Sequence, residues 1–166
     1  MRSAALFVRR AGAYLIDYAV IAAYALGLLV LTLAIAPDAS LSKPAAYVLA
    51  LGTLTAPVVL AFALFEAAFG LSPGKAVLGL RVGRNGTRPV FMRALARNVI
   101  KFLPWEIAHI GIWLTPGQPM IDPPGALSLV LMNAAMAAVV VQAVLIAIWK
   151  SGVHDWASGL RVSPRP

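Results

Sequence analysis

Residues 9–35 read RRAGAYLIDYAVIAAYALGLLVLTLAI, two arginines followed by a long apolar run. The run exceeds the roughly 20 apolar residues with which an α-helix crosses a hydrocarbon core. Asp17 interrupts the run about two helical turns from its start, although apolar surroundings penalise a charged group. The stretch therefore predicts a membrane-spanning helix that must find a partner for one carboxylate.

The composition of the whole chain also indicates a membrane protein. Of its 166 residues, 61% are hydrophobic and only 12% are charged, which is unusual for a soluble domain. The net charge is +8, but the basic residues lie in short clusters between apolar blocks, as in the cytoplasmic loops of membrane proteins. We expect no nucleic-acid partner, because no basic stripe with interleaved aromatic residues occurs. The absence of cysteine excludes disulfides and thiolate sites.

Four apolar segments are expected to form a helical bundle. The first could be mistaken for a cleaved secretion signal, but its length and Asp17 favour a retained helix. One later segment is a weaker candidate, because it is short and contains Pro104, Glu106 and His109. The predicted spans are about 13–36, 45–69, 102–118 (the weak segment) and 126–149, within a single domain over 1–166.

The distribution of lysine and arginine predicts the orientation of these spans. The loop 70–101 contains several basic residues and no acidic residue, which places it in the cytoplasm by the positive-inside rule. The basic N-terminus and the tail 150–166 are assigned to the same side, so the weak segment must also cross. We expect an integral membrane protein with both termini cytoplasmic.

The loop and the tail are expected to form a small cytoplasmic cap. The sequence of residues 79–82, GLRV, recurs at 159–162, so the two β-prone stretches could pair. Asn85-Gly86 is typical of a two-residue hairpin turn. From Met92 the sequence MRALARNVIKFL predicts an amphipathic helix in the membrane interface, with basic side chains reaching the headgroups. The predicted fold class is an all-α integral membrane protein with a cap that includes a short β-hairpin.

The intramembrane acids are the first candidates for a functional site. Arg10, Tyr14 and Asp17 share one helix face, and Asp17 lies about 6 Å below the expected boundary, within reach of an arginine. Because the second helix runs back toward the cytoplasm, Glu66 is expected to lie near the same boundary. The cluster could pin helices together, or it could move protons or cations. Besides these two acids, the expected members are Arg9, Arg10, Lys75, Arg97 and Asp155. Possible supporting residues are Tyr14, Asn98 and His154.

Other motifs give little support to catalysis or metal binding. The segment around Lys75 lacks the spacing of a phosphate loop, and no nucleophile motif occurs, so we expect neither an enzyme nor a cofactor. Asp155 could fix the tautomer of His154 or cap a helix. Too few ligands surround the histidines for a metal site. Small residues four apart, Ala23 with Gly27 and Ala134 with Ala138, would permit a homo-oligomer.

Several separated motifs follow one another along the chain: Arg10 before the first helix, Asp17 within it, SPGKAVLGLRV, the NG turn, RALARN and the closing HDWASGLRV. Together they resemble the RDD family of small, mostly bacterial membrane proteins, and this resemblance implies a bacterial inner membrane. The resemblance implies that the family's arginine and two aspartates are Arg9 or Arg10, Asp17 and Asp155. It also implies a role in transport, including cation/proton antiport, or a role as an accessory subunit of a membrane assembly. The remaining expected partners are the lipid bilayer and anionic headgroups on the cytoplasmic side.

Overall fold

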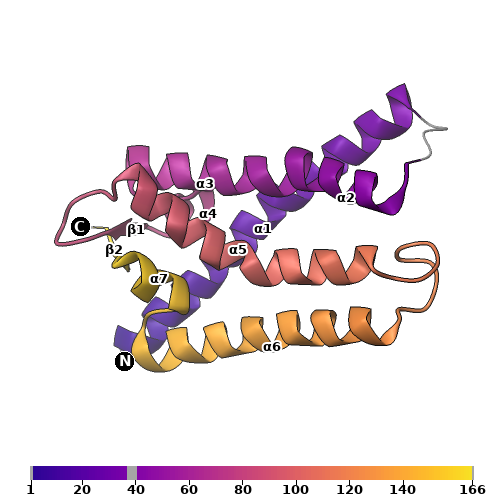
Figure 1. Ribbon diagram of the computed structural model, residues 1–166. Helices are drawn as coiled ribbons and strands as arrows, with labels where there is room; N and C mark the ends of the chain where they lie inside the picture. Colours follow the sequence, from indigo (N-terminus) through magenta and orange to yellow (C-terminus); the bar gives the residue numbers. More distant parts are fainter. Residues whose placement is uncertain (1, 37–40, 166) are drawn as a thin grey trace.

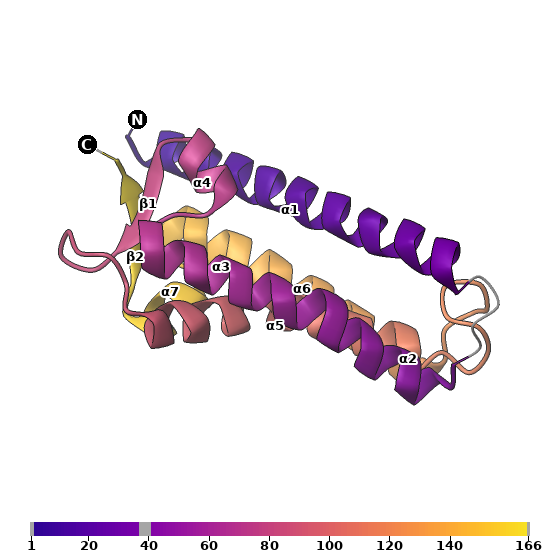
Figure 2. The ribbon, with the colours of Figure 1, turned by 90° about the horizontal axis from the view of Figure 1, so that it is seen from above.

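The long helices run the length of the molecule (Figure 1, Figure 2). The short elements within residues 73–83 and 153–164 gather at the end where both termini lie, whereas the short helix at 43–50 lies at the other end. The computed structural model describes residues 2–36 and 41–165. Helices α3, α5 and α6 run alongside one another, and α1 crosses them obliquely (Figure 1). In chain order the elements are α1 (Arg2–Ile35), α2 (Lys43–Ala50), the π-helix η1 (Leu51–Thr55), α3 (Ala56–Phe69), α4 (Pro73–Val77), β1 (Leu80–Gly83), α5 (Phe91–Trp113), α6 (Ala126–Trp149), α7 (Val153–Ser158) and β2 (Arg161–Pro164).

Three helical segments in the described part of the chain are long and apolar enough to cross a membrane. They are Ala4–Ile35, Lys43–Val77 and Ala126–Trp149, which overlap the predicted spans 13–36, 45–69 and 126–149. The weak segment 102–118 does not belong to this set. It forms the second half of α5, which ends at Trp113.

The amphipathic helix predicted from Met92 is present, but two of its basic side chains do not reach outward as predicted. The segment is the first half of α5, and the helix continues through Pro104. Its basic residues Arg97 and Lys101 are buried, with 0% and 8% exposure, instead of reaching outward. The physical reason is that carboxylates from other helices face the same side of α5, so protein groups replace the headgroups as partners.

The two GLRV stretches pair, as their similarity predicts. Strands β1 and β2 are antiparallel, with Val82 opposite Val162. Asn85 and Gly86 adopt φ of 49° and 83°, as a two-residue hairpin turn requires. However, the expected hairpin reduces to one bridge between Arg84 and Thr87, because the tail supplies the partner of β1.

The buried polar residues lie between two apolar clusters. On the cap side, Ala13 packs with residues of β1 and β2. On the membrane side, Ile21 packs with residues of α3 and α5, including the edge-on pair Phe62 and Phe102 at 5.5 Å between ring centroids. Asp17 lies midway between Ala13 and Ile21 on the same face of α1. The polar residues therefore form a layer between the cap core and the membrane core.

Candidate functional site

Helix α1 directs Arg10 and Asp17 into the interior, as their spacing predicts. The two residues are 3% and 2% exposed. We expected an arginine to reach Asp17, but Arg10 does not contact it. Arg10 instead donates to Asp155 Oδ2 at 2.6 Å and to the carbonyl oxygen of Lys150 at 2.7 Å. The arginine thus fastens the tail to the first helix and leaves Asp17 to other partners.

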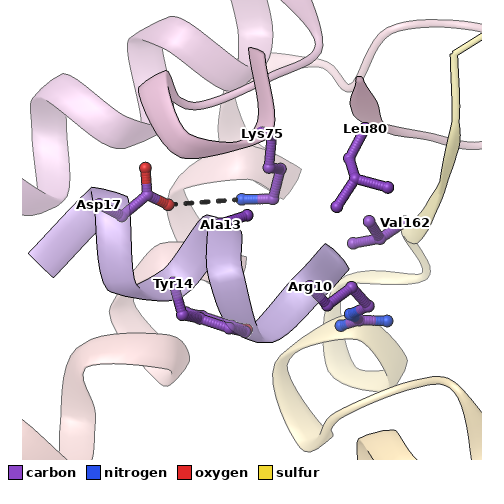
Figure 3. Close-up of a pocket in the computed structure, with 7 residues that line it drawn as sticks. All are labelled: Arg10, Ala13, Tyr14, Asp17, Lys75, Leu80 and Val162. Atoms are coloured by element: carbon purple, nitrogen blue, oxygen red, sulfur yellow. Dashed lines mark ion pairs between the residues drawn. The ribbon is translucent and has the colours of Figure 1, made fainter. Parts of the chain in front are cut away.

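Asp17 is bound by α4 and by two lysines. Gly70, at φ 71°, ends α3 and turns the chain into α4. The Ser72 hydroxyl and the Gly74 amide then donate to the two oxygens of Asp17, each at 2.8 Å. The ammonium groups of Lys75 and Lys101 lie 4.0 and 3.6 Å from Oδ2 (Figure 3 draws the Lys75 pair). The carboxylate therefore stabilises the beginning of α4 as a capping side chain would.

Glu66 is fully enclosed, and both of its oxygens accept hydrogen bonds. Its side chain has no exposed surface. Oε1 accepts from Lys75 at 3.1 Å and from Arg97 at 2.6 Å, and Oε2 accepts from Asn98 at 3.0 Å. This satisfies the buried charge as a dry interior demands.

Arg97 joins Glu66 to Asp155. Its Nε and Nη2 donate to Asp155 Oδ1 at 3.0 and 2.8 Å. Asp155 Oδ2 also accepts from the backbone N–H of Gly152 at 3.0 Å, so it caps α7 as expected. Burial alone would raise the pKa of Asp155, but the guanidinium of Arg97 holds it below its usual range.

These contacts close into a circuit that we call the ion-pair ring. It passes from α1 through α4, α3, α5 and α7 and returns to α1. Removal of one partner from a buried ion pair typically costs about 3–5 kcal/mol, so the circuit fixes all five helices relative to one another. Its members, in order, are Asp17, Lys75, Glu66, Arg97, Asp155 and Arg10.

The remaining predicted residues lie next to the ring or outside it. Arg9 is outside, because it donates to the carbonyl oxygens of Leu78 and Gly79. Asn98 contacts Glu66, as described above. Sequence reasoning missed Lys101, although its position one turn after Arg97 on an amphipathic helix could have indicated it. No group of three or more histidine or acidic residues that could hold a metal occurs in the described ranges.

His154 is an uncharged neighbour of the ring. Its ring nitrogens contact the Tyr14 hydroxyl at 3.0 Å and Gln142 Oε1 at 2.7 Å. Burial, aided by the charge of Arg97, lowers the pKa of His154 to about 3 against the opposing effect of Asp155. The imidazole is therefore neutral at physiological pH and serves as a hydrogen-bonding bridge between α1, α6 and α7.

Acid should destabilise the protein through His154. Because its pKa in the folded state lies below the ordinary 6.5, the unfolded chain binds the proton more tightly, and stability falls as pH drops below 6.5. We expect the melting temperature in detergent to decrease between pH 6.5 and 5, above the range in which carboxylates titrate. His154→Gln should flatten this slope, whereas His109→Gln should retain it. An unchanged slope in the first variant would contradict the assignment.

A second polar group lies farther from the cap, between α2 and α5. The Tyr47 hydroxyl donates to Glu106 Oε1 at 2.8 Å, and Glu106 Oε2 lies 4.0 Å from His109 Nδ1. Sequence reasoning treated these residues as a reason to doubt the fourth span. Their partner from α2 shows that the polar side chains of α5 point into the protein here too. A cavity of about 550 Å³ next to them is lined by residues including Lys43, Tyr47, Ile110, Trp113 and Leu114.

The ring itself leaves little space for water or a ligand. A cavity of about 10 Å³ lies between Arg10, Tyr14, Asp17 and Lys75 (Figure 3). This is about the space needed for a single water molecule. The site is therefore closed in this conformation.

Comparisons with known proteins bear on the resemblance. No curated protein and no solved structure matches the chain. The family model described as "RDD family" matches residues 4–159, nearly the whole chain. The match includes Arg10, Asp17 and Asp155, the arginine and the two aspartates that meet at the ion-pair ring. The chain therefore belongs to the RDD family.

Proposed function

We propose that this membrane protein crosses a bacterial inner membrane four times, with the cap and both termini in the cytoplasm. Both termini lie at the cap end (Figure 2), and the exposed arginines of the cap satisfy the positive-inside rule. A crossing α5 would return the chain from the cap to the far end, where α6 begins. The described basic residues that are exposed on this side and available to anionic headgroups are Arg84, Arg88, Arg93, Lys150, Arg161 and Arg165.

Within that membrane we propose a non-catalytic role as a scaffold or accessory subunit. The observation that carries this is the complete pairing of Asp17 and Glu66 beside a cavity of only about 10 Å³. A carrier needs an aqueous path to its ionisable groups and a way to expose them alternately. Paired and enclosed acids instead suit a device that holds helices in place.

A homo-oligomer belongs to the same proposal. Ala23 and Gly27 lie on the exposed side of α1, and nothing lies within 4 Å of a side chain placed at Gly27. A helix of a second copy could approach closely there, because small residues permit tight packing between membrane helices.

Cation/proton exchange is the second candidate, and the charges of the site favour it. The layer holds the three carboxylates of the ring but four basic groups, because Lys101 lies beside the three basic members. The Nζ of Lys101 has no hydrogen-bond partner. An exchanger needs a buried group that can give up a proton without breaking the fold, and Lys101 has the surroundings of such a group.

Ion flux separates the two candidates. The wild-type protein, reconstituted in vesicles under a pH gradient, should give no flux above that of protein-free vesicles. Asp17→Asn should lower the melting temperature or the yield, because it removes the charge that two lysines face. The exposed acid of the outer loop, in Asp122→Asn, is the matched control and should change neither. A wild-type flux that disappears in a well-folded Asp17→Asn variant would contradict the scaffold and support exchange.

A further inference from the structure

Lys101 is buried without the partners that a buried ammonium group requires. Its side chain is 4% exposed, and within residues 2–36 and 41–165 no atom accepts a hydrogen bond from its Nζ. Asp17 Oδ2 lies 3.6 Å away but already accepts from Ser72. The other lysine nearby is better placed, because Lys75 donates to both Glu66 and Ser72. A protonated Lys101 is therefore poorly compensated for its lost hydration.

Aromatic rings provide most of the remaining surroundings of this ammonium group. Nζ lies 5.0 Å from the ring centroid of Tyr14, 4.7 Å from that of Phe62 and 4.8 Å from that of Phe102. Ring faces attract a cation, but more weakly than a hydrogen-bonded carboxylate does. They also tolerate an uncharged amine at no electrostatic cost. The position is thus suited to both protonation states.

The charge balance of the layer distinguishes the two states. The ion-pair ring contains three acidic and three basic side chains and is neutral by itself. His154 adds no charge near neutral pH. Protonated Lys101 gives the buried layer one excess positive charge, whereas the free amine leaves it balanced.

We infer that Lys101 is a proton-binding site, which gains and loses one proton while the ion-pair ring beside it stays ionised. Every charged group that faces it belongs to that ring: Asp17 on α1, Glu66 on α3, Lys75 on α4 and Arg97 on α5, with the Tyr14 hydroxyl beside them. Burial and the charge of Lys75 lower the pKa of Lys101 to about 7, against the opposing effect of Asp17 and Glu66. This proton-binding site is compatible with a scaffold as well as with an exchanger.

The small cavity of the ring lies beside the groups that surround Lys101. Tyr14 and Asp17 line this cavity, and both also contact Lys101. When Lys101 releases its proton to solvent, the N–H bond breaks and Nζ keeps the electron pair as the free amine. The ion pairs of the ring stay unchanged in this step.

The first test is the pH dependence of stability. Because the pKa of Lys101 in the folded state lies below the ordinary 10.5, folding disfavours its protonated form, so stability rises as pH rises from about 7. We expect the melting temperature of the wild type to increase by roughly 5 °C between pH 7 and 9. Lys101→Met should lose this increase. Lys150→Met, which removes an exposed lysine, should keep it.

The second test reads the proton directly and does not depend on how the variant folds. In the wild type with ¹⁵N-labelled lysine, the Nζ signal of one of the four lysines should change from ammonium to amine near pH 7. If this titrating signal is missing from the spectrum of Lys101→Met, the signal belongs to Lys101. If Lys101→Met does not fold, Lys101→Arg serves the same purpose. Four ammonium signals up to pH 9, or a titrating signal that persists in the Lys101 variant, would overturn the inference. Neither result requires ion flux, so failure here is distinguishable from failure of the proposed function.

Discussion

Arg97→Met is expected to abolish stable folding. The guanidinium of Arg97 binds Glu66 and Asp155 at the same time, and all three side chains are fully buried. Methionine would leave two carboxylates short of their main partner. Breaking one buried pair costs about 3–5 kcal/mol, and two such losses approach the whole stability of a typical domain, about 5–15 kcal/mol. Size-exclusion chromatography in detergent should show aggregate in place of a single folded peak.

Arg93→Met is the matched control for this prediction. Arg93 lies one turn earlier on α5, is exposed, and makes only a long contact of 3.4 Å with the carbonyl oxygen of Ser158. Its loss should cost at most about 1 kcal/mol. If Arg97→Met eluted and melted like Arg93→Met, the ion-pair ring would not hold the helices together.

Gly74→Ala is expected to separate α4 from α1. A β-carbon at residue 74 would overlap the backbone carbonyl group of Ala13, which cannot move aside as a flexible side chain could. Moving α4 away would also break the bond from the Gly74 amide to Asp17. We expect a loss of about 3 kcal/mol or more, measured as a large decrease in melting temperature. Alanine favours a helix more than glycine does, so helix propensity alone would make Gly74→Ala more stable. A decrease in stability therefore identifies the clash with α1 as the cause.

Gly52→Ala shows what the same substitution does where space is free. Nothing lies within 4 Å of a β-carbon at that position. This variant should be neutral or slightly more stable. A similar decrease in both variants would mean that the close approach of α4 to α1 is not what Gly74 provides.

The sequence predicts the layout of this protein well, because length, hydropathy and periodicity act locally. The run after Arg10 is too long and apolar for anything but a span, and it matches α1. The repeated GLRV identifies two β-prone stretches, and these two stretches pair in the structure. The spacing of Arg10 and Asp17 fixes their common face. Each of these inferences depends on neighbours within a few turns or on a visible repeat.

The choice of partners could not be predicted in the same way. Arg10 pairs with Asp155, 145 positions away, and not with the nearer Asp17, because tertiary packing brings α7 against the start of α1. An amphipathic face such as that of Arg97 and Lys101 fits lipid headgroups and buried carboxylates equally well from the sequence alone. Only the positions of α3 and α7 decide between them.

The ion-pair ring also sets an order of events during synthesis. Arg10 leaves the ribosome before its partner, because Asp155 follows only after α6 has been made. Until then Arg97 can reach Glu66 but not its second carboxylate, and β1 lacks its companion strand. A nascent chain that has not yet reached Asp155 therefore has an open cap, in which Arg10 and β1 still lack their partners.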